Sequence, residues 1–362
     1  MLVNLEVGSV LLALLVVATW IQRRRRAEKS ASSLAPPIHL DSKQGTTRIT
    51  PLEHFNVDAT EPHPYRPWSS GKFAMTMGIQ KVPSEEWLTL DRRYVPEQAL
   101  RRELLARHHD GVMQILPGSE SACEEVLSMV VSYLTQRYPH LFYHPSGQLD
   151  HIYNKLTEQT FKIVAPYDVP PLEIAAQLAM EDINILYPGF GEDPEQHYLA
   201  ASYSMAPAGW DLRERIGWPL WKIHSPVPMW QEKLQRSVEK YFHKMKADDL
   251  IARHNYFVQT DDILFQQVPF AERLPEPPKI EDIRIRHERQ TLRRLPRTGA
   301  ILFLVRTYIM PLTDLRDDPD SLRAFLSSVR AMPPNMAKYK GRPVWGETVE
   351  RWCAEILEEP IS

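Results

Sequence analysis

Two strand-like runs in the last third of the chain, residues 283–295 and 300–309, constrain the fold most strongly. The second run is apolar apart from Arg306 and Thr307, and only the four residues 296–299 separate it from the first. A connection this short, with proline and glycine at its ends, is typical of an antiparallel hairpin. The sequence therefore predicts an antiparallel sheet, with further strands over 198–205 and 255–268.

Helical patterns lie before, within and after these strands. Residues 51–96 are rich in proline and aromatic side chains, which predicts an ordered but irregular segment packed on the body. The resulting fold class is α+β. Apolar residues at helical spacing predict six helices. The first runs through Leu100–Leu105 and ends near Asp110, the second starts at Ser121 with a capping box to Glu124, and the third starts at Pro171. The others start near Pro228 and lie around 322–329 and 349–356.

The N-terminus carries an apolar run from Val7 to Ile21, followed at once by four arginines over 23–26. A helix of this run alone would be roughly 22 Å long, and including Met1–Glu6 brings it close to the ~30 Å bilayer core. A cleaved signal peptide is the rival interpretation, but it would place its positive charges before the apolar run. The charge order favours an uncleaved single-pass anchor with the body in the cytosol. We expect the membrane to be that of the endoplasmic reticulum.

These features divide the chain into four parts. We expect a membrane anchor with a basic stop over 1–26, a polar tether over 27–50, the main domain over 51–335 and a C-terminal helical tail over 336–362. The tether has no periodic apolar pattern, which is typical of a linker.

Composition excludes several classes of protein. The formal net charge of −3 argues against a general nucleic-acid binder. Two cysteines cannot form a four-cysteine zinc or iron–sulfur site, and they indicate a reducing compartment. Cys353 lies at helical spacing beside Trp352, which predicts a packed cysteine and not a haem thiolate. No dinucleotide-binding, phosphate-loop, HExxH or GxSxG motif occurs.

One candidate site is the segment GWPLWKIHSPVPMW at 217–230, which contains three tryptophans, three prolines and, at its centre, His224. Proline fixes the backbone on each side, and the aromatic rings supply apolar walls. A histidine in such surroundings suits an axial haem ligand, because neutral imidazole binds iron well. The alternative is a core histidine whose ring is satisfied by a backbone carbonyl.

The other candidate is the strand pair itself, which holds six arginines between 284 and 297. Strand alternation puts Ile285, His287, Arg289 and Thr291 on one face and Arg286, Glu288, Gln290 and Leu292 on the other. Buried charges need partners, and guanidinium groups bind carboxylates such as haem propionates bidentately. The alternative is a solvated arginine edge strand, which suits Arg293, Arg294 and Arg297 better than Arg289 or Arg306.

At these segments the chain resembles the haem-dependent oxidative N-demethylase alpha-subunit-like proteins, including the fungal HRQ family. The matching stretches span most of the body, in family order. They are PYRPWSSGKFAMTMGIQ at 64–80, WLTLDRRY at 87–94, WKIHSPVP at 221–228, and ERQTLRRLP with GAILFLVRTY over 288–308.

The resemblance implies a PAS-like antiparallel sheet elaborated by helices and holding haem b through a histidine. It makes His224 the candidate iron ligand, Arg289 and Arg306 candidate cofactor-binding residues, and Glu288 and Tyr308 candidate catalytic residues. A buried Glu288 would suit a cationic ammonium substrate, which must lose a proton before its C–H bond is oxidised.

The implied activity is O₂-dependent oxidative demethylation of a small amine or a related metabolite, with release of formaldehyde. Electrons would come from NADPH through a partner reductase, because the chain carries no flavin or iron–sulfur module of its own. Two alternatives stay open: a non-enzymatic haem-PAS sensor, and a membrane-tethered interaction protein that has lost its haem.

Overall fold

The computed structural model describes residues 49–63, 66–68, 70–269 and 277–359. The predicted anchor over 1–26 and almost all of the tether over 27–50 lie outside these residues. Within the described part, no helix is both long enough and apolar enough to cross a bilayer.

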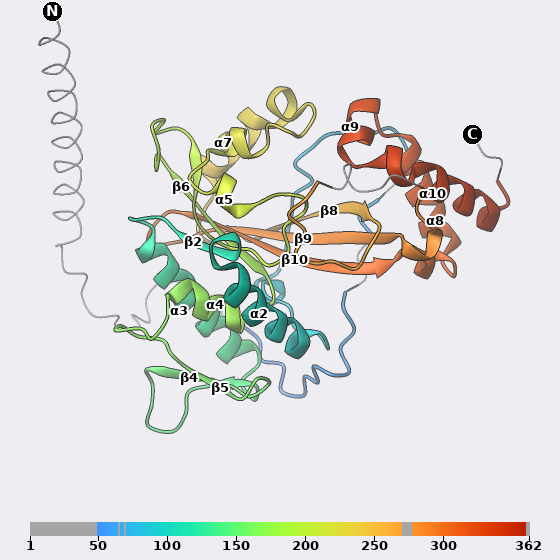
Figure 1. The fold of residues 1–362 in the computed structure, drawn as a ribbon. Helices are drawn as coiled ribbons and strands as arrows, with labels where there is room; N and C mark the ends of the chain where they lie inside the picture. Colours follow the sequence, from blue (N-terminus) through green and yellow to red (C-terminus); the bar gives the residue numbers. More distant parts are fainter. Residues whose placement is uncertain (1–48, 64–65, 69, 270–276, 360–362) are drawn as a thin grey trace, which may run out of the picture. The chain divides into compact units, whose positions relative to one another are not determined.

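An antiparallel sheet of seven strands forms the centre, in the order β1-β8-β9-β10-β6-β7-β2 (Figure 1). The predicted hairpin is confirmed, since β9 and β10 pair from Arg284 opposite Pro311 to Arg294 opposite Ile301. β9 lies between β8 and β10, so the edge-strand interpretation of its arginines is wrong. The strands are β1 (Gln80–Lys81), β2 (Met113–Ile115), β6 (Asp182–Pro188), β7 (His197–Tyr203), β8 (Ile251–Gln259), β9 (Arg284–Arg294) and β10 (Ile301–Pro311).

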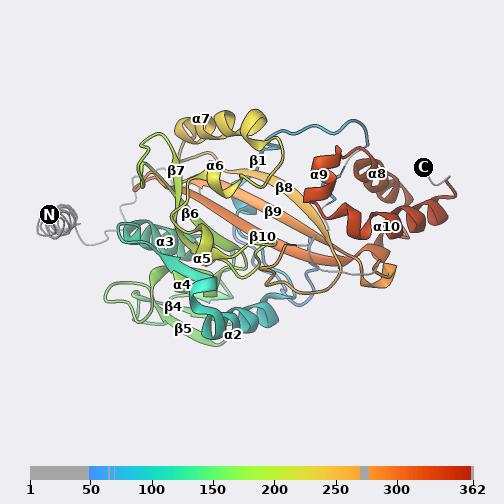
Figure 2. The same ribbon diagram turned by 45° about the horizontal axis from the view of Figure 1, so that its top comes forward.

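Helices cover both faces and one end of this sheet, as both ribbon views show (Figures 1 and 2). One face carries α2 (Tyr94–Val112), α3 (Glu120–Arg137) and α4 (Pro171–Leu178). The other carries α5 (Leu212–Arg215), α6 (Leu220–Ile223), a π-helical turn (Gln231–Gln235) and α7 (Arg236–Lys244). At the end of β8–β10 lie α8 (Pro319–Arg330), α9 (Pro334–Tyr339) and α10 (Arg342–Leu357). A small second sheet contains β3 (Phe142–Tyr143), β4 (His151–Asn154) and β5 (Gln159–Lys162), and the α+β class is confirmed.

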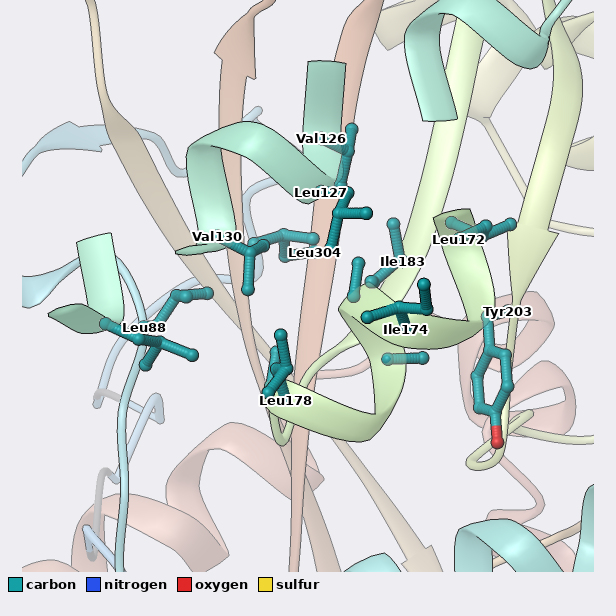
Figure 3. Packing of buried hydrophobic residues seen from close by; sticks show 14 of the residues in the cluster. Leu88, Val126, Leu127, Val130, Leu172, Ile174, Leu178, Ile183, Tyr203 and Leu304 are labelled. Carbon is teal, nitrogen blue, oxygen red and sulfur yellow. The ribbon is translucent and has the colours of Figure 1, made fainter. Parts of the chain in front are cut away.

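The main core lies between the sheet and the α2–α4 layer (Figure 3). Burying one Leu, Ile or Val side chain stabilises a fold by about 1.5–3 kcal/mol, so this layer holds the sheet rigidly. Cys353 of α10 is fully buried in a second cluster, which confirms the packed cysteine. Residues that meet in the main core include Val126, Leu127 and Val130 of α3, Leu172, Ile174 and Leu178 of α4, and Ile183, Tyr203 and Leu304 of the sheet.

Two predicted elements have wrong boundaries: the strand over 255–268, which begins earlier, at Ile251, and ends earlier, and the helix from Ser121. β8 ends at Gln259 and not at 268, because the Asp261 carboxylate accepts the Ile263 backbone N–H (3.0 Å) and turns the chain. α3 begins at Glu120, so Ser121 lies inside the helix and forms no capping box. Ser119 is the N-cap residue, but its hydroxyl donates to the Leu116 and Ala200 carbonyls instead (2.7 and 3.2 Å).

Candidate functional site

A cavity of about 1620 Å³ lies over the sheet face that is turned away from the α2–α4 layer. It exceeds the roughly 300–1,000 Å³ of ordinary small-ligand pockets. The predicted alternation of β9 is confirmed, since Glu288, Gln290 and Leu292 line the cavity from one face of the strand. The cavity therefore has room for a large cofactor together with a small substrate.

The sheet gives this cavity an apolar region and a polar region in successive rows of paired residues. In one row, Ile251, Leu292 and Phe303 pair across β8, β9 and β10 and line the cavity. This row is the apolar region. In the next cavity-facing row Arg253 pairs with Gln290, and one row further Asn255 pairs with Glu288; these two rows are the polar region. Trp230, which precedes the π-helical turn, covers the apolar region together with Leu234 of that turn and Val238 and Phe242 of α7.

The predicted tryptophan–proline segment forms part of the cavity wall, and backbone hydrogen bonds fix it to β7. Gly217 N–H donates to the Leu199 carbonyl (2.8 Å), and Leu199 N–H donates to the Trp218 carbonyl (3.0 Å). Gly217 has a φ of +78°, a conformation that favours glycine. Met229 also has a positive φ of 61°, which is strained for methionine and typical of functional segments. The segment is thus held in one conformation, with His224 at the end of α6.

His224 lines the cavity with one ring nitrogen already engaged. Its Nδ1–H donates to the Leu220 carbonyl (2.9 Å), and its ring stacks on Trp230 with centroids 4.8 Å apart and planes 7° apart. Burial lowers the pKa of His224 to about 4, so the ring is neutral near pH 7. The carbonyl contact expected for a core histidine is present, but it leaves Nε2 as the ring's acceptor. Histidines that bind metals commonly donate their second N–H to a backbone carbonyl in this way.

A second imidazole, His254 of β8, also lines the cavity. Its Nδ1 lies 3.0 Å from Nε2 of His287, and the two rings stack with centroids 5.3 Å apart. Burial lowers the pKa of His254 to about 4 and that of His287 to about 3. A carbonyl can only accept, so Leu220 fixes the tautomer of His224 with Nε2 as acceptor, whereas His287 can donate to or accept from His254; His224 is therefore the better defined ligand.

Two arginines that no sequence pattern indicated also line the cavity. Arg253 of β8 and Arg215 of α5 both line the cavity, and neither forms an ion pair with any residue that the structure describes. Nε of Arg253 is buried without a hydrogen-bond partner there, and Arg215 lies over the Trp210 ring at 5.1 Å. Burial lowers the pKa of both groups, and both act electrostatically on His224. They can bind the carboxylates of a ligand held beside His224.

At the polar region, Glu288 is held by two side-chain amides. Asn255 Nδ2 and Gln290 Nε2 both donate to its Oε2 (3.3 and 2.9 Å), and Arg286 Nε lies 3.8 Å from Oε1. Lys340, between α9 and α10, donates from Nζ to Asn255 Oδ1 (2.9 Å). Asn255 therefore connects the lysine to the carboxylate, and its amide orientation is fixed from both sides.

The remaining predicted residues lie on other surfaces of the sheet. Arg289 donates to the carbonyls of Trp87 (3.3 Å) and Glu86. Arg306 pairs with Glu97 (2.6 Å) and Asp91 (2.9 Å). The structure thus brings His224 and Glu288 to one cavity, whereas Arg289 and Arg306 bind protein groups beneath it. Tyr308 is buried with Arg306 over its ring (4.7 Å) and stacks on His287.

One further group of potential metal ligands lies outside the cavity lining: His197 of β7 with Glu239 and His243 of α7. His197 Nδ1–H donates directly to Glu239 Oε2 (2.6 Å). This buried hydrogen bond joins α7 to the sheet and so stabilises the cover of the cavity.

The fold and the cavity define an α+β protein with a large ligand site that offers a neutral imidazole and guanidinium groups. The chain belongs to the family described as haem-dependent oxidative N-demethylase, alpha subunit-like, whose sequence profile matches residues 78–350, more than half of the chain. This membership confirms the resemblance found in the sequence, and it supports haem as cofactor and an oxidoreductase in general.

The cavity residues fit a haem. Nε2 of His224, which has no hydrogen-bond partner among the described residues, is a suitable iron ligand, and apolar side chains such as Trp230, Leu234 and Phe242 line the same cavity. Arg215 and Arg253 supply cations for two carboxylates, and a haem b carries two propionates.

Proposed function

We propose that this chain is a haem-dependent oxidoreductase that removes a methyl group from a small amine. The reaction balances as follows: the N-methylamine, O₂, two electrons and two protons give the demethylated amine, formaldehyde and water. The observation that carries the proposal is His224, a neutral imidazole whose Nδ1–H is bound to a carbonyl and whose Nε2 is left in a large, partly apolar cavity.

Haem, when bound, supplies the activation of O₂, and the chain's own residues do the rest. His224 would hold the iron, with Trp230 fixing the plane of its ring. Arg215 and Arg253 would hold the propionates. Glu288, oriented by Asn255 and Gln290, would attract a cationic amine to the polar region. Arg289, Arg306 and Tyr308 would support the sheet beneath and not touch the ligand.

Three further expectations are part of this proposal. Electrons would come from NADPH through a separate reductase, because the sequence contains no dinucleotide-binding motif. The apolar N-terminus would hold the body at the cytosolic side of the endoplasmic reticulum, close to a membrane-bound reductase. An antiparallel sheet with a ligand-sized cavity over one face supports a PAS-like origin.

Formaldehyde release tests the proposed activity. The full-length chain, expressed with ample haem supply and purified in detergent, would be given a chemical reductant, O₂ and a panel of N-methylamines. We expect formaldehyde only when reductant, O₂ and amine are all present, and none from His224→Ala. His109→Ala, which removes an exposed histidine outside the cavity, is the matched control. Haem binding without any amine oxidation would favour the sensor alternative.

A further inference from the structure

Lys340 is an unusual member of the cavity wall. It comes from the segment between α9 and α10, in a part of the chain that the sequence assigned to a tail. Its backbone N–H donates to the Met336 carbonyl (2.9 Å), and its carbonyl accepts from Trp345 Nε1 (3.1 Å). The side chain is therefore held at the polar region by backbone contacts on both sides.

The amino group of Lys340 has two hydrogen-bond acceptors among the residues that the structure describes. Nζ donates to Asn255 Oδ1 (2.9 Å) and to the Tyr256 carbonyl (2.5 Å), and it lies 4.0 Å from the centroid of Phe257. Among the residues that the structure describes, no carboxylate forms an ion pair with it. A neutral amine has two N–H donors and one lone pair. In the neutral form the two acceptors engage both donors, so the lone pair of Nζ has no hydrogen-bond partner among the described residues, and Lys340 lines the cavity.

We propose that Lys340 accepts the proton that an ammonium substrate must lose before its methyl group is oxidised. An N–H bond of the substrate breaks, a new N–H bond forms on Nζ, and the freed electron pair stays on the substrate nitrogen. The resulting lysine ammonium is stabilised by the same two acceptors and, through Asn255, by Glu288. This inference rests on the proposed function and assigns a catalytic residue to its substrate site.

The electrostatic surroundings agree with this role. Burial lowers the pKa of Lys340 to about 7, with Glu288 of β9 acting to raise it and Arg253 of β8 acting to lower it. Tyr256 donates to or accepts from Ser328 of α8 (2.7 Å), and burial raises its pKa to about 12, so it stays neutral. A base whose pKa lies near the working pH is the most effective kind. Removal from water in the same surroundings would also lower the pKa of a bound ammonium.

Competitive labelling of the full-length protein with acetic anhydride tests the state of the amine without any turnover. Peptide mass spectrometry would follow the labelling of Lys340 from pH 6 to 11 against a free lysine analogue, whose pKa is ~10.4. We expect half-maximal reactivity of Lys340 near pH 7. Titration near pH 10 would overturn the proposal. So would absence of labelling at every pH, because a small amine could not then reach the residue.

Turnover by Lys340→Met and Lys340→Arg tests its role, with the exposed Lys155→Met as matched control. For an aliphatic N-methylamine we expect kcat/KM to fall at least about 100-fold in both Lys340 variants, because arginine keeps the charge but cannot accept a proton. A weakly basic N-methylaniline, already neutral at pH 7, should be oxidised almost as well as by wild type. Equal losses on both substrates, or retained activity in Lys340→Arg, would overturn the proposal. If the wild-type protein itself releases no formaldehyde, the proposed function is refuted, and the role of Lys340 is not the cause.

Discussion

Replacing Arg306 by methionine separates a structural role for this residue from cofactor binding. Arg306 is 1% exposed and forms ion pairs with Asp91 and Glu97, both also buried. Burial alone would lower its pKa, but Glu97, Tyr308 and Asp91 together raise the pKa above its ordinary value. Removing one partner of a buried ion pair destabilises a protein by about 3–5 kcal/mol, because the remaining charge is left uncompensated. We therefore expect Arg306→Met to lose about 3–5 kcal/mol of unfolding free energy at pH 8.

Guanidinium denaturation, followed by tryptophan fluorescence, measures this loss. Burial already raises the pKa of Glu97, and without Arg306 the pKa rises further. Protonation of the carboxylate then relieves the uncompensated charge, so the deficit of the variant should be smaller at pH 5 than at pH 8. Arg92→Met is the control, since it breaks an exposed pair with Glu61 (2.7 Å) that is worth about 0–1 kcal/mol. If Arg306→Met is as stable as wild type but does not bind haem, this reasoning is refuted, and Arg306 is a cofactor-binding residue after all.

Three other changes test separate parts of the structure. Leu304→Ala empties part of the main core (Figure 3) and should cost about 2–5 kcal/mol of unfolding free energy, measured by denaturation, while haem absorption stays unchanged. Trp230→Leu removes the ring stacked on His224, worth about 0.5–1.5 kcal/mol, and should weaken haem affinity by up to about tenfold in a haemin titration. Lys340 has a folded pKa of about 7, below the ~10.4 of an unfolded lysine, so the unfolded chain binds more protons between these values. Unfolding free energy should therefore rise from pH 7 to 10 in wild type more than in Lys340→Met; parallel curves would contradict the low pKa.

The sequence predicted the features that depend on local pattern. Alternation along β9 grouped Glu288 with Gln290 and Leu292 on one face, because side-chain direction in a strand has a period of two, and the structure shows that this face lines the cavity. The prolines and tryptophans around His224 marked a fixed apolar segment, and the structure places that histidine in the cavity wall. Strand β6, by contrast, was not predicted, since a short run buried on both faces has no period to distinguish it from helix.

The features that depend on distant partners could not be predicted in this way. Arg306 and Arg253 are both arginines within strands. Arg306 is neutralised by Glu97, which lies 209 positions away in the sequence, whereas Arg253 lies in the cavity wall. Only the tertiary fold creates this difference. Arg253 also lay just before the strand that the pattern indicated. Lys340 reaches the cavity because α8–α10 pack against the end of the sheet, and nothing in its neighbouring sequence marks this contact.

Haemin titration of the apo-protein, followed by visible absorption, tests the central claim most directly. The full-length wild type should bind one haem with saturation and give the Soret band of a histidine-ligated iron. His224→Ala should lose this band, and added imidazole should restore it by occupying the vacated position, whereas His109→Ala should match wild type. Binding that does not saturate, or an identical spectrum for His224→Ala and wild type, would contradict the assignment of His224 as the iron ligand.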